Sequence, residues 1–350
     1  MEPFKIGILD FTYISRLKSS RTASVSTSHE SSLLREAIKA QGHIVKMYRV
    51  EKCQMYFNNR RPEILYNNKK IKGCDVLIPR VSVSGGIDLE ISIVKQFQMM
   101  GIPVVNKYLP TARAKNKLRT LQVLTNRNIP VPRTLVVRKL QYLDEGIKKV
   151  GGYPIIIKSP FGSYGIGVAI VESRRSLYSA LDIIWNNTSS SIILIQEYVE
   201  EAQGSDFRAY VIGDKVAASM RRTAIQGDFR SNLHHGGLAE KVILSSEEQK
   251  LAVRASQALG LEISGVDLLR TNKGPVVMEV NANPGFEGLM QVTGIDIPAE
   301  MVRYAVTVAR KHKMLLKKRW LYPFTDNFIH KAVFQRLFRG HKVVAVGVFF

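Results

Sequence analysis

Cysteine is nearly absent from this chain of 350 residues, which contains only Cys53 and Cys74. Their spacing matches no metal-binding motif, so we expect two reduced thiols, as is usual for a cytoplasmic protein. Long apolar runs are also missing. The longest, at residues 153–157 and 192–195, have the length of a strand, so no transmembrane segment is expected. The first residues predict a strand, at 4–9, and not a basic and then apolar leader.

Acidic residues are scarce beside basic ones: 29 Asp and Glu against 51 Lys and Arg give a formal net charge of +22. Such an excess attracts nucleic acid, an anionic membrane or an acidic protein partner, and it does not choose among them. An enzyme that handles a nucleoside triphosphate and acidic substrates would also benefit from it. No Gly-x-Ser-x-Gly motif and no distinct Cys/His pair is present, so we do not expect covalent catalysis.

Strands and helices alternate along the chain, which predicts an α/β fold with a largely parallel sheet near the N-terminus. The pattern suggests an N-terminal α/β domain at residues 1–108, a second unit at 109–191, a third at 192–310 and a basic extension at 311–350. Expected strands lie at 4–9, 43–48, 75–79, 102–105, 134–137, 153–159 and 168–171, and expected helices at 31–41, 89–100, 111–125, 143–150 and 176–185.

The last forty residues differ in character from the rest. Between residues 311 and 342 many lysines and arginines stand against a single acid, Asp326. Apolar residues recur at roughly helical spacing from 328 to 338. Two interpretations remain open: a basic amphipathic helix at an anionic surface, or a helix packed on the body of the protein with a solvated basic face.

A predicted β-hairpin carries the most informative polar side chains. Two apolar runs are separated by Asn-Lys-Gly at residues 272–274, a typical hairpin loop. With this three-residue loop Thr271 faces Pro275, and the same register places Asp267 opposite Glu279. Opposed side chains have their β-carbons roughly 4.5–5.5 Å apart, so the two carboxylates are expected to be close neighbours.

Two facing carboxylates repel each other unless a cation lies between them. Asn281 shares a face with Glu279 because side chains alternate along a strand. The oxygens of Asp267, Glu279 and Asn281 suit magnesium or manganese, which usually share their ligand shell with substrate phosphates. The alternative is that Asp267 or Glu279 merely pairs with an arginine, such as Arg222 or Arg230.

A strand at residues 155–158 delivers Lys158 to a glycine-rich loop that contains Gly162, Gly165 and Gly167. Glycines let backbone N–H groups approach phosphate oxygens, while the lysine supplies a point charge. The loop is neither a Walker loop nor a dinucleotide fingerprint, because it does not lead into a helix. A glycine-rich hairpin without special function remains the alternative.

Two further segments offer polar groups to a ligand. The apolar strand at 193–195 ends in Gln196, Glu197 and Tyr198, and such a segment could present backbone groups to an adenine edge. The loop at 227–237 is rich in donors, and Arg230 and Asn232 could bind phosphates or a carboxylate. Its two adjacent histidines are a weak metal signal, since no third soft ligand is near in sequence.

In this order the motifs resemble the ATP-grasp superfamily and, within it, the RimK-like glutamate ligases. The most specific segment is Met-Glu-Val-Asn-Ala-Asn-Pro-Gly-Phe-Glu-Gly at 278–288, followed by Thr-Gly-Ile-Asp-Ile at 293–297. The resemblance implies an ATP-grasp fold, two α+β subdomains that clasp ATP, preceded by a small parallel-sheet α/β domain. His235 departs from the family pattern, which usually has arginine there, and the tail from residue 311 lies outside it.

The resemblance also implies roles for single residues. The expected ATP-binding residues are Lys117, Lys158, Gly162, Gly165, Gly167, Glu197, Tyr198, Asp206, Arg230, Ser231 and Asn232. Asp267, Glu279 and Asn281 would bind magnesium, two ions in all, with manganese as a substitute. Catalysis would depend on Lys158, Arg230 and Arg222, the last contacting the reacting phosphoryl or carboxylate group.

The implied activity is ATP-dependent ligation of a carboxylate and an amine through an acyl phosphate. The leading acceptor is the acidic C-terminus of the sixth small-subunit ribosomal protein, extended with L-glutamate, with possible ribosome association and, by family resemblance, a tetramer. One alternative is a glutamate or amino-acid ligase that acts on a small-molecule cofactor or precursor. Another is a non-catalytic ATP-binding protein of the ribosome or RNA, with salt-dependent RNA binding and no ADP release.

Overall fold

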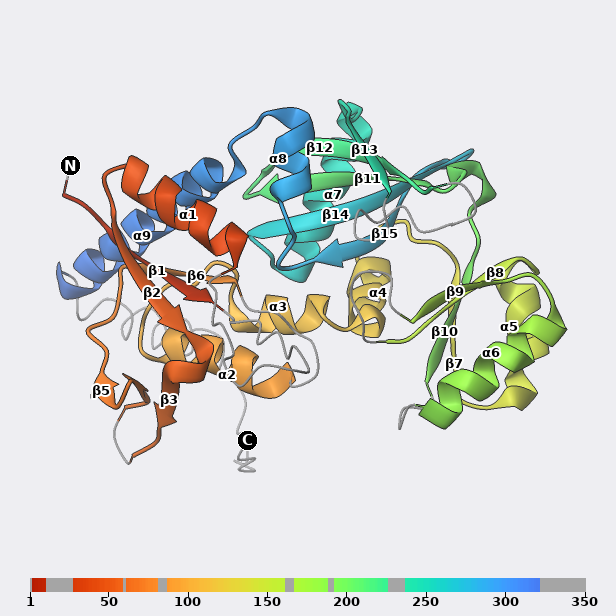
Figure 1. Ribbon diagram of the computed structural model, residues 1–350, viewed down its shortest axis with the longest axis horizontal. Coiled ribbons are helices and arrows are strands. Elements are labelled where there is room, and N and C mark those ends of the chain that lie inside the picture. Colours follow the sequence, from red (N-terminus) through yellow and green to blue (C-terminus); the bar gives the residue numbers. More distant parts are fainter. Residues whose placement is uncertain are drawn as a thin grey trace, which may run out of the picture.

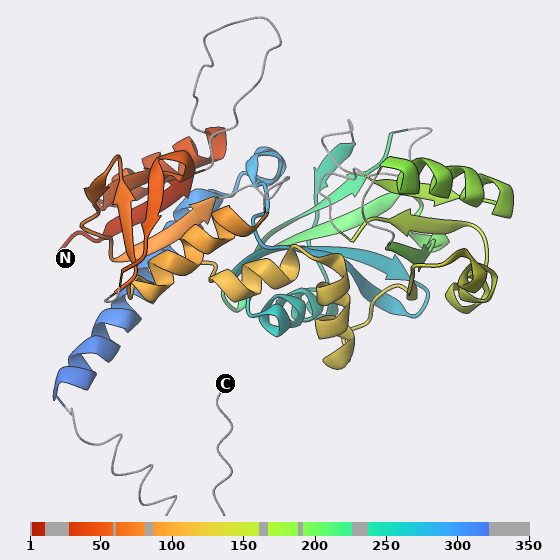
Figure 2. The ribbon, with the colours of Figure 1, turned by 90° about the horizontal axis from the view of Figure 1, so that it is seen from below.

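The computed structural model describes residues 2–10, 28–58, 61–80, 87–160, 167–187, 192–225 and 237–321. Its elements form three groups that follow one another along the longest axis (Figures 1 and 2). A parallel sheet with helices lies at one end, a five-stranded antiparallel sheet in the middle, and a four-stranded antiparallel sheet at the other end. The predicted α/β class and the N-terminal parallel sheet are confirmed.

The N-terminal sheet has the strand order β2-β1-β6. Its elements are β1 (Lys5–Asp10), β2 (Ile44–Arg49), β6 (Val76–Arg80) and the helices α1 (His29–Ala40) and α2 (Ile87–Met99). The central strand is buried on both faces, as is usual for parallel strands covered by helices. Ile6 and Ile8 pack with Leu34 of α1, whereas Leu9 packs with Phe97 of α2.

Two details of this region differ from the prediction. The strand expected at residues 102–105 is wrong, because Val104 forms only one isolated parallel bridge, with Leu77. Pro103 has no N–H to donate, which disfavours a longer ladder at that position. A small antiparallel sheet was not predicted: η1 (Val50–Lys52) leads into β3 (Cys53–Tyr56), β4 (Glu63–Tyr66) and β5 (Lys69–Lys70).

The single helix predicted at 111–125 is two helices, α3 (Tyr108–Ala114) and α4 (Lys117–Asn126). The break occurs at Asn116, whose side-chain oxygen accepts the N–H of Arg119 at 3.1 Å and so caps α4. Asparagine is among the strongest N-cap residues, because its side chain satisfies an N–H that the helix leaves unpaired. The break places Lys117 at the first position of a new helix.

The four-stranded sheet has the order β7-β10-β8-β9, with antiparallel pairing throughout. Its elements are β7 (Thr134–Val137), η2 (Leu140–Tyr142), α5 (Leu143–Val150), β8 (Ile155–Lys158), β9 (Val168–Val171), α6 (Arg174–Asn187) and β10 (Ile193–Glu197). The boundary predicted between residues 191 and 192 falls between α6 and β10, and β10 lies inside this sheet. Ile193 and Ile195 complete the core of this unit with Ile155 and Ile157.

The five-stranded sheet has the order β13-β12-β11-β14-β15 and is antiparallel. Its region contains η3 (Glu200–Ala202), β11 (Ser205–Ile212), β12 (Lys215–Thr223), β13 (Leu238–Lys241), α7 (Ser246–Leu259), β14 (Ile263–Thr271), β15 (Gly274–Asn281), α8 (Glu287–Thr293) and α9 (Ile297–Leu321). Phe207, Ala209 and Val211 of β11 pack on the face that α7 covers. The alternate residues of β11 face the other way.

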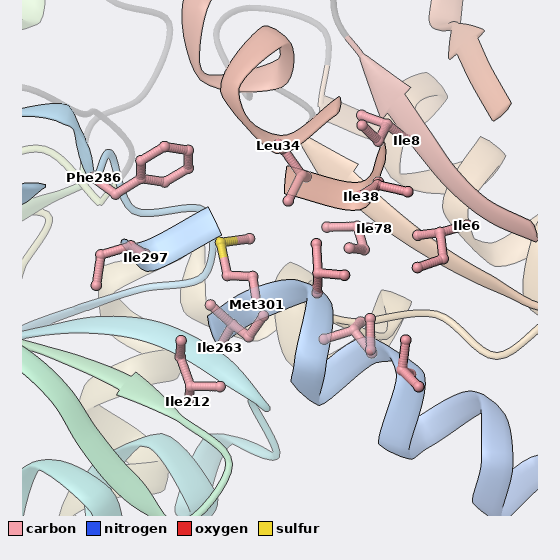
Figure 3. Packing of buried hydrophobic residues seen from close by; sticks show 14 of the residues in the cluster. Ile6, Ile8, Leu34, Ile38, Ile78, Ile212, Ile263, Phe286, Ile297 and Met301 are labelled. Carbon is pink, nitrogen blue, oxygen red and sulfur yellow. The ribbon is translucent and has the colours of Figure 1, made fainter. Parts of the chain in front are cut away.

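The face of the five-stranded sheet opposite α7 is apolar at one end and charged at the other. At one end Tyr210, Ile212 and Ile263 join a core that continues through α9 into the N-terminal unit. Figure 3 shows Ile6, Ile8, Leu34, Ile38 and Ile78 of the N-terminal unit on one side of this core, with Ile212, Ile263, Phe286, Ile297 and Met301 on the other. The opposite end of the same face carries charged side chains, among them Arg208 and Asp267.

Asn106 joins the two units by hydrogen bonds. Its amide nitrogen donates to the carbonyl oxygens of Ile263, at 2.6 Å, and Ala282, at 2.8 Å. Its amide oxygen accepts the N–H groups of Glu262 and Ile263, each at 2.8 Å. The predicted N-terminal domain of 108 residues is thus fastened to the start of β14 and the end of β15.

Helix α9 runs without interruption past residue 310, so the boundary predicted there falls inside a helix. The predicted apolar pattern at 328–338 lies outside the described residues. Of the helices within the described ranges, none combines the length and the apolar character needed to cross a membrane.

Candidate active site

The hairpin of β14 and β15 places Asp267 opposite Glu279, as the sequence predicts. The turn that does so is different, because Thr271 pairs with Gly274 and the loop is only two residues long. Gly274 has a φ of 108°, a value that glycine adopts freely. The shorter loop would shift the register by one residue, and a bulge between Asp267 and Leu268 removes that shift.

A ladder of buried charges crosses the sheet at this level. Arg222 of β12 donates from Nε and Nη2 to the two carboxylate oxygens of Asp206 on β11, at 2.6 and 2.8 Å. Its Nη2 is also 3.1 Å from Oδ2 of Asp267. Arg208 of β11 donates from Nε and Nη2 to Oδ1 and Oδ2 of Asp267, both at 2.8 Å. The alternative that Asp267 pairs with arginines is therefore realised in this structure.

The burial of Arg222 changes its expected role. Its side chain is 3% exposed and lies between two carboxylates that are equally buried. Burial opposes its charge, but Asp267 and Asp206 outweigh that effect and raise the pKa of Arg222. Direct contact of Arg222 with the reacting group stays a prediction; in this structure its Nε and Nη2 are engaged by Asp206 and Asp267, which favours a role in positioning these carboxylates.

The chemistry of Asp267 is compatible with a metal ion. Burial raises the pKa of its carboxyl group, but the charges of Arg208 and Arg222 outweigh burial and hold the pKa below its usual range. Oδ2 of Asp267 is approached by Arg208, Arg222 and Asn281, whereas Oδ1, among the described residues, accepts from Arg208 alone. A carboxylate oxygen can accept two hydrogen bonds, so Oδ1 is the atom through which Asp267 could bind a cation while it stays paired.

The other two predicted ligands lie on β15. Asn281 donates from Nδ2 to Oδ2 of Asp267 at 3.5 Å, and Glu279 is 3.3 Å from Nζ of Lys117. In the described part of the chain no group of three or more His, Cys, Asp and Glu is placed to bind a metal. An ion here would need the amide oxygen of Asn281 and oxygens from a substrate, which is the mixed shell that magnesium prefers.

The segment after Asn281 is held by the N-terminal unit. Glu30 of α1 accepts the N–H of Phe286 at 2.7 Å and pairs with Arg80 of β6. Arg80 also donates to the carbonyl oxygen of Pro284 at 3.2 Å and lies over the ring of Phe286. These contacts fix the path of the chain directly after the predicted metal ligands.

Lys158 is the last residue of β8 and belongs to the four-stranded sheet. Its Nζ donates to Oε1 of Gln196 at 2.7 Å, and Gln196 donates in turn to Oγ1 of Thr134 at 2.8 Å. Burial lowers the pKa of Lys158 to about 8; the carboxylates of Glu279 and Asp267 oppose this shift, and the charge of Lys117 adds to it. Lys117 and Lys158, which belong to different units, therefore both act on Glu279.

We expect ATP to bind up to about tenfold more weakly at pH 9 than at pH 7. The pKa of Lys158 is lowered to about 8, so most of its positive charge is lost over that range. Titration calorimetry with ATP across this range tests the expectation, and Lys158→Arg should flatten the profile because arginine stays charged. An unchanged affinity in the wild type would contradict it.

The lowered pKa of Lys158 affects the stability of the fold in the opposite direction to its effect on ATP affinity: stability rises with pH. The pKa of Lys158 in the folded protein lies below its ordinary value of 10.5, so the unfolded chain binds more protons between about pH 8 and 10.5. The contribution of Lys158 to the free energy of unfolding therefore rises with pH through this window. A loss of ATP affinity at pH 9 is thus not expected to reflect unfolding caused by this residue.

The remaining predicted ATP-binding residues are placed only in part. Glu197 accepts the backbone N–H of Arg133 at 3.0 Å and also forms an ion pair with its side chain. Tyr198 follows directly after β10, and the carbonyl oxygen of Gly167 accepts the N–H of Ser159 at 3.2 Å. Five predicted residues lie outside the described part of the chain: Gly162, Gly165, Arg230, Ser231 and Asn232.

Sequence reasoning missed Arg208 and did not give Gln196 a role at Lys158. Arg208 could have been found, because it is two residues after Asp206 on a strand and must share its face. Gln196 precedes Glu197, and only the pairing of β10 with β8 brings it to Lys158. No signal in the sequence pairs those two strands.

Comparisons with known proteins agree with this geometry. A family model for the RimK-like ATP-grasp domain matches residues 114–305, and one for the RimK PreATP-grasp domain matches residues 21–109. A probable alpha-L-glutamate ligase of Pseudoalteromonas translucida is 42% identical over 269 residues, which are 77% of this chain and 88% of that protein. A relative with the same name from Maridesulfovibrio salexigens is 41% identical over 81% of this chain and 93% of its own length.

Solved structures show the same fold at lower identity. The ATP-grasp ligase PsnB, complexed with minimal precursor, has a TM-score of 0.66 and 18% identity, covering 88% of this chain and 100% of that chain. A RimK domain protein ATP-grasp from Sphaerobacter thermophilus has a TM-score of 0.64 and 21% identity, covering 86% and 99%. From the matched domains and the identity to its relatives, the chain belongs to the RimK-like ATP-grasp family and is an ATP-dependent ligase.

Proposed function

We propose that this ligase adds L-glutamate to the acidic C-terminus of a protein, with ATP and magnesium. The observation that carries the proposal is the ion pair of Lys117 with Glu279, at 3.3 Å, on the strand next to Asp267, with Lys158 close enough for its pKa to respond to both carboxylates. These lysines are the proposed phosphate-binding cations, and the carboxylates are the proposed metal ligands. The glutamate specificity is supported by relatives named probable alpha-L-glutamate ligase.

The nucleotide would lie between the four-stranded and the five-stranded sheets. Glu197 and Tyr198, at the end of β10, are proposed to hold the adenine end, and Asp206 of β11 is a further proposed nucleotide-site residue. Lys117 and Lys158 would bind phosphate oxygens, together with the glycine-rich loop that ends at Gly167. The predicted loop residues Arg230, Ser231 and Asn232 would complete this site.

Asp267, Glu279 and Asn281 are proposed to hold magnesium, and manganese would fit the same oxygen ligands. When bound, the metal would supply positive charge that offsets the negative charge of the phosphates of ATP. Arg208 and Arg222 keep Asp267 ionised, and we assign Arg222 to positioning because Asp206 and Asp267 enclose it.

The proposed reaction has two steps, phosphoryl transfer and amide formation. The γ-phosphoryl group of ATP moves to an oxygen of the acceptor carboxylate, which gives an acyl phosphate and ADP. The amine of glutamate then attacks the acyl carbon, so that an amide bond forms while phosphate and a proton leave. The lysines stabilise the negative charge that develops on the transferred phosphoryl group, a task of positioning and electrostatics.

The identity of the acceptor is the most specific part of the proposal. The net charge of +22 favours an acidic protein tail and a growing chain of glutamates. The acidic C-terminus of the sixth small-subunit ribosomal protein is the acceptor that we would test first. A small-molecule carboxylate is the competing acceptor, since the site chemistry is the same for both.

Mass spectrometry of the candidate ribosomal protein tests this proposal, after incubation with the enzyme, ATP, magnesium and glutamate. We expect a ladder of additions, each with the mass of one glutamate residue. If ADP is released with another carboxylate and the ribosomal protein shows no ladder, the ligase activity stands and that carboxylate replaces the ribosomal protein as the proposed acceptor. Strong RNA binding, with neither additions nor ADP release under any of these conditions, would contradict the proposed activity.

A further inference from the structure

The carboxylates proposed to bind metal are already paired with cations of the protein. Arg208 engages both oxygens of Asp267 at 2.8 Å, Arg222 approaches one of them at 3.1 Å, and Lys117 is 3.3 Å from Glu279. Asp267 is almost completely buried, with 2% of its side chain exposed. A metal ion would therefore enter a site whose negative charge is largely cancelled.

The charges on this face of the sheet favour phosphate more than a free cation. Among the described residues that form this ladder and its neighbouring ion pairs, four cations face three carboxylates: Lys117, Lys158, Arg208 and Arg222 against Asp206, Asp267 and Glu279. Within this set positive charge is in excess. A divalent cation that binds without nucleotide is repelled by this excess of positive charge. The phosphates of a nucleotide reverse the sign of the local charge and bring their own oxygen ligands.

We propose that Arg208 is a positioning residue that makes metal binding depend on nucleotide. Its planar fork holds Asp267 in one orientation through two hydrogen bonds of 2.8 Å, and among the described residues Arg208 is the one donor to Oδ1. Its charge opposes a divalent ion until phosphates are present. The inference rests on the proposed function, because it takes Asp267, Glu279 and Asn281 as the metal ligands.

Binding of manganese to the nucleotide-free protein tests this inference directly. Manganese is added to the protein, and the free ion is measured by electron paramagnetic resonance, without and with a non-hydrolysable ATP analogue. The ion that the same analogue binds in the absence of protein is subtracted, so that the remaining loss reports metal held by the protein. We expect wild type to bind the metal at least tenfold more tightly with the analogue. We expect Arg208→Gln to bind it at least tenfold more tightly than wild type when nucleotide is absent.

A second variant separates charge from orientation. Arg208→Lys keeps the positive charge but loses the bidentate fork. Its nucleotide-free metal affinity should stay near that of wild type, while kcat falls and the KM for ATP changes little. Arg221→Gln is the matched control: it removes an arginine on β12, 43% exposed and paired with Glu240, and should leave both measurements unchanged.

Thermal unfolding shows whether Arg208→Gln is folded and gives an independent reading. Magnesium without nucleotide should raise the melting temperature of Arg208→Gln and leave that of wild type unchanged, because a ligand stabilises only a state that binds it. The inference is overturned if wild type binds manganese equally well without nucleotide, or if Arg208→Gln binds it no better than Arg221→Gln. If wild type binds no metal even with the analogue, the proposed metal site fails instead.

Discussion

Replacing Glu279 by glutamine is expected to lower the rate of ligation at least about 100-fold, a loss of roughly 3 kcal/mol of transition-state stabilisation. The change keeps the shape of the side chain and removes the charge that the proposed metal needs. It also removes the ion pair that Glu279 forms with Lys117, at 3.3 Å. Steady-state ADP release, measured against magnesium concentration, should show a lower kcat and a weaker dependence on the metal.

The fold should survive this substitution. Glu279 is 34% exposed, and its ion pair with Lys117 contributes only about 1 kcal/mol or less at such a position. Glu240→Gln is a suitable control, because that carboxylate lies on β13 and pairs with Arg221 at the surface. If Glu279→Gln had the rate and magnesium dependence of wild type, Glu279 would not be a metal ligand.

Replacing Arg222 by methionine is expected to lower the free energy of unfolding by about 3–5 kcal/mol, the usual cost of removing one partner of a buried ion pair. The guanidinium group is 3% exposed and makes two hydrogen bonds with Asp206 and a close contact with Asp267. Its removal leaves Asp206 buried without this partner, while Asp267 keeps Arg208. Urea unfolding followed by circular dichroism measures the loss.

Two further variants test the cause of this destabilisation. Arg221→Met changes the adjacent arginine, which is 43% exposed, and should cost less than about 1 kcal/mol. Combining Arg222→Met with Asp206→Asn should cost less than the sum of the two single changes, because no uncompensated charge is then buried between them. Stability equal to wild type in Arg222→Met would show that the buried ladder contributes little.

The chemical character of the site follows from local patterns. Alternation along two neighbouring strands is enough to bring Asp267, Glu279 and Asn281 to one face, and the structure has that register. The prediction of the turn was wrong by one residue, and a bulge compensates for it. The glycine-rich segment after Lys158 and the specific run at 278–288 also indicate the family through short motifs alone.

The partners of those residues were decided by tertiary structure. Arg208 shares a strand face with Asp206, but it forms its ion pair with Asp267 because β11 pairs with β14. Lys117 reaches Glu279 because Asn116 starts a second helix where one continuous helix was predicted. Each contact joins residues that are far apart in the chain, and local periodicity carries no information about such pairs.

The sequence by itself determined the fold class, the family and the side chains available for chemistry, because periodicity and short motifs act over a few residues. Only the tertiary structure decided that β10 lies within the four-stranded sheet, and that α9 joins the N-terminal unit and the five-stranded sheet in one core. It also decided that arginines neutralise Asp267. These outcomes depend on which buried surfaces meet, and that is settled by packing and by the need to pair every buried charge.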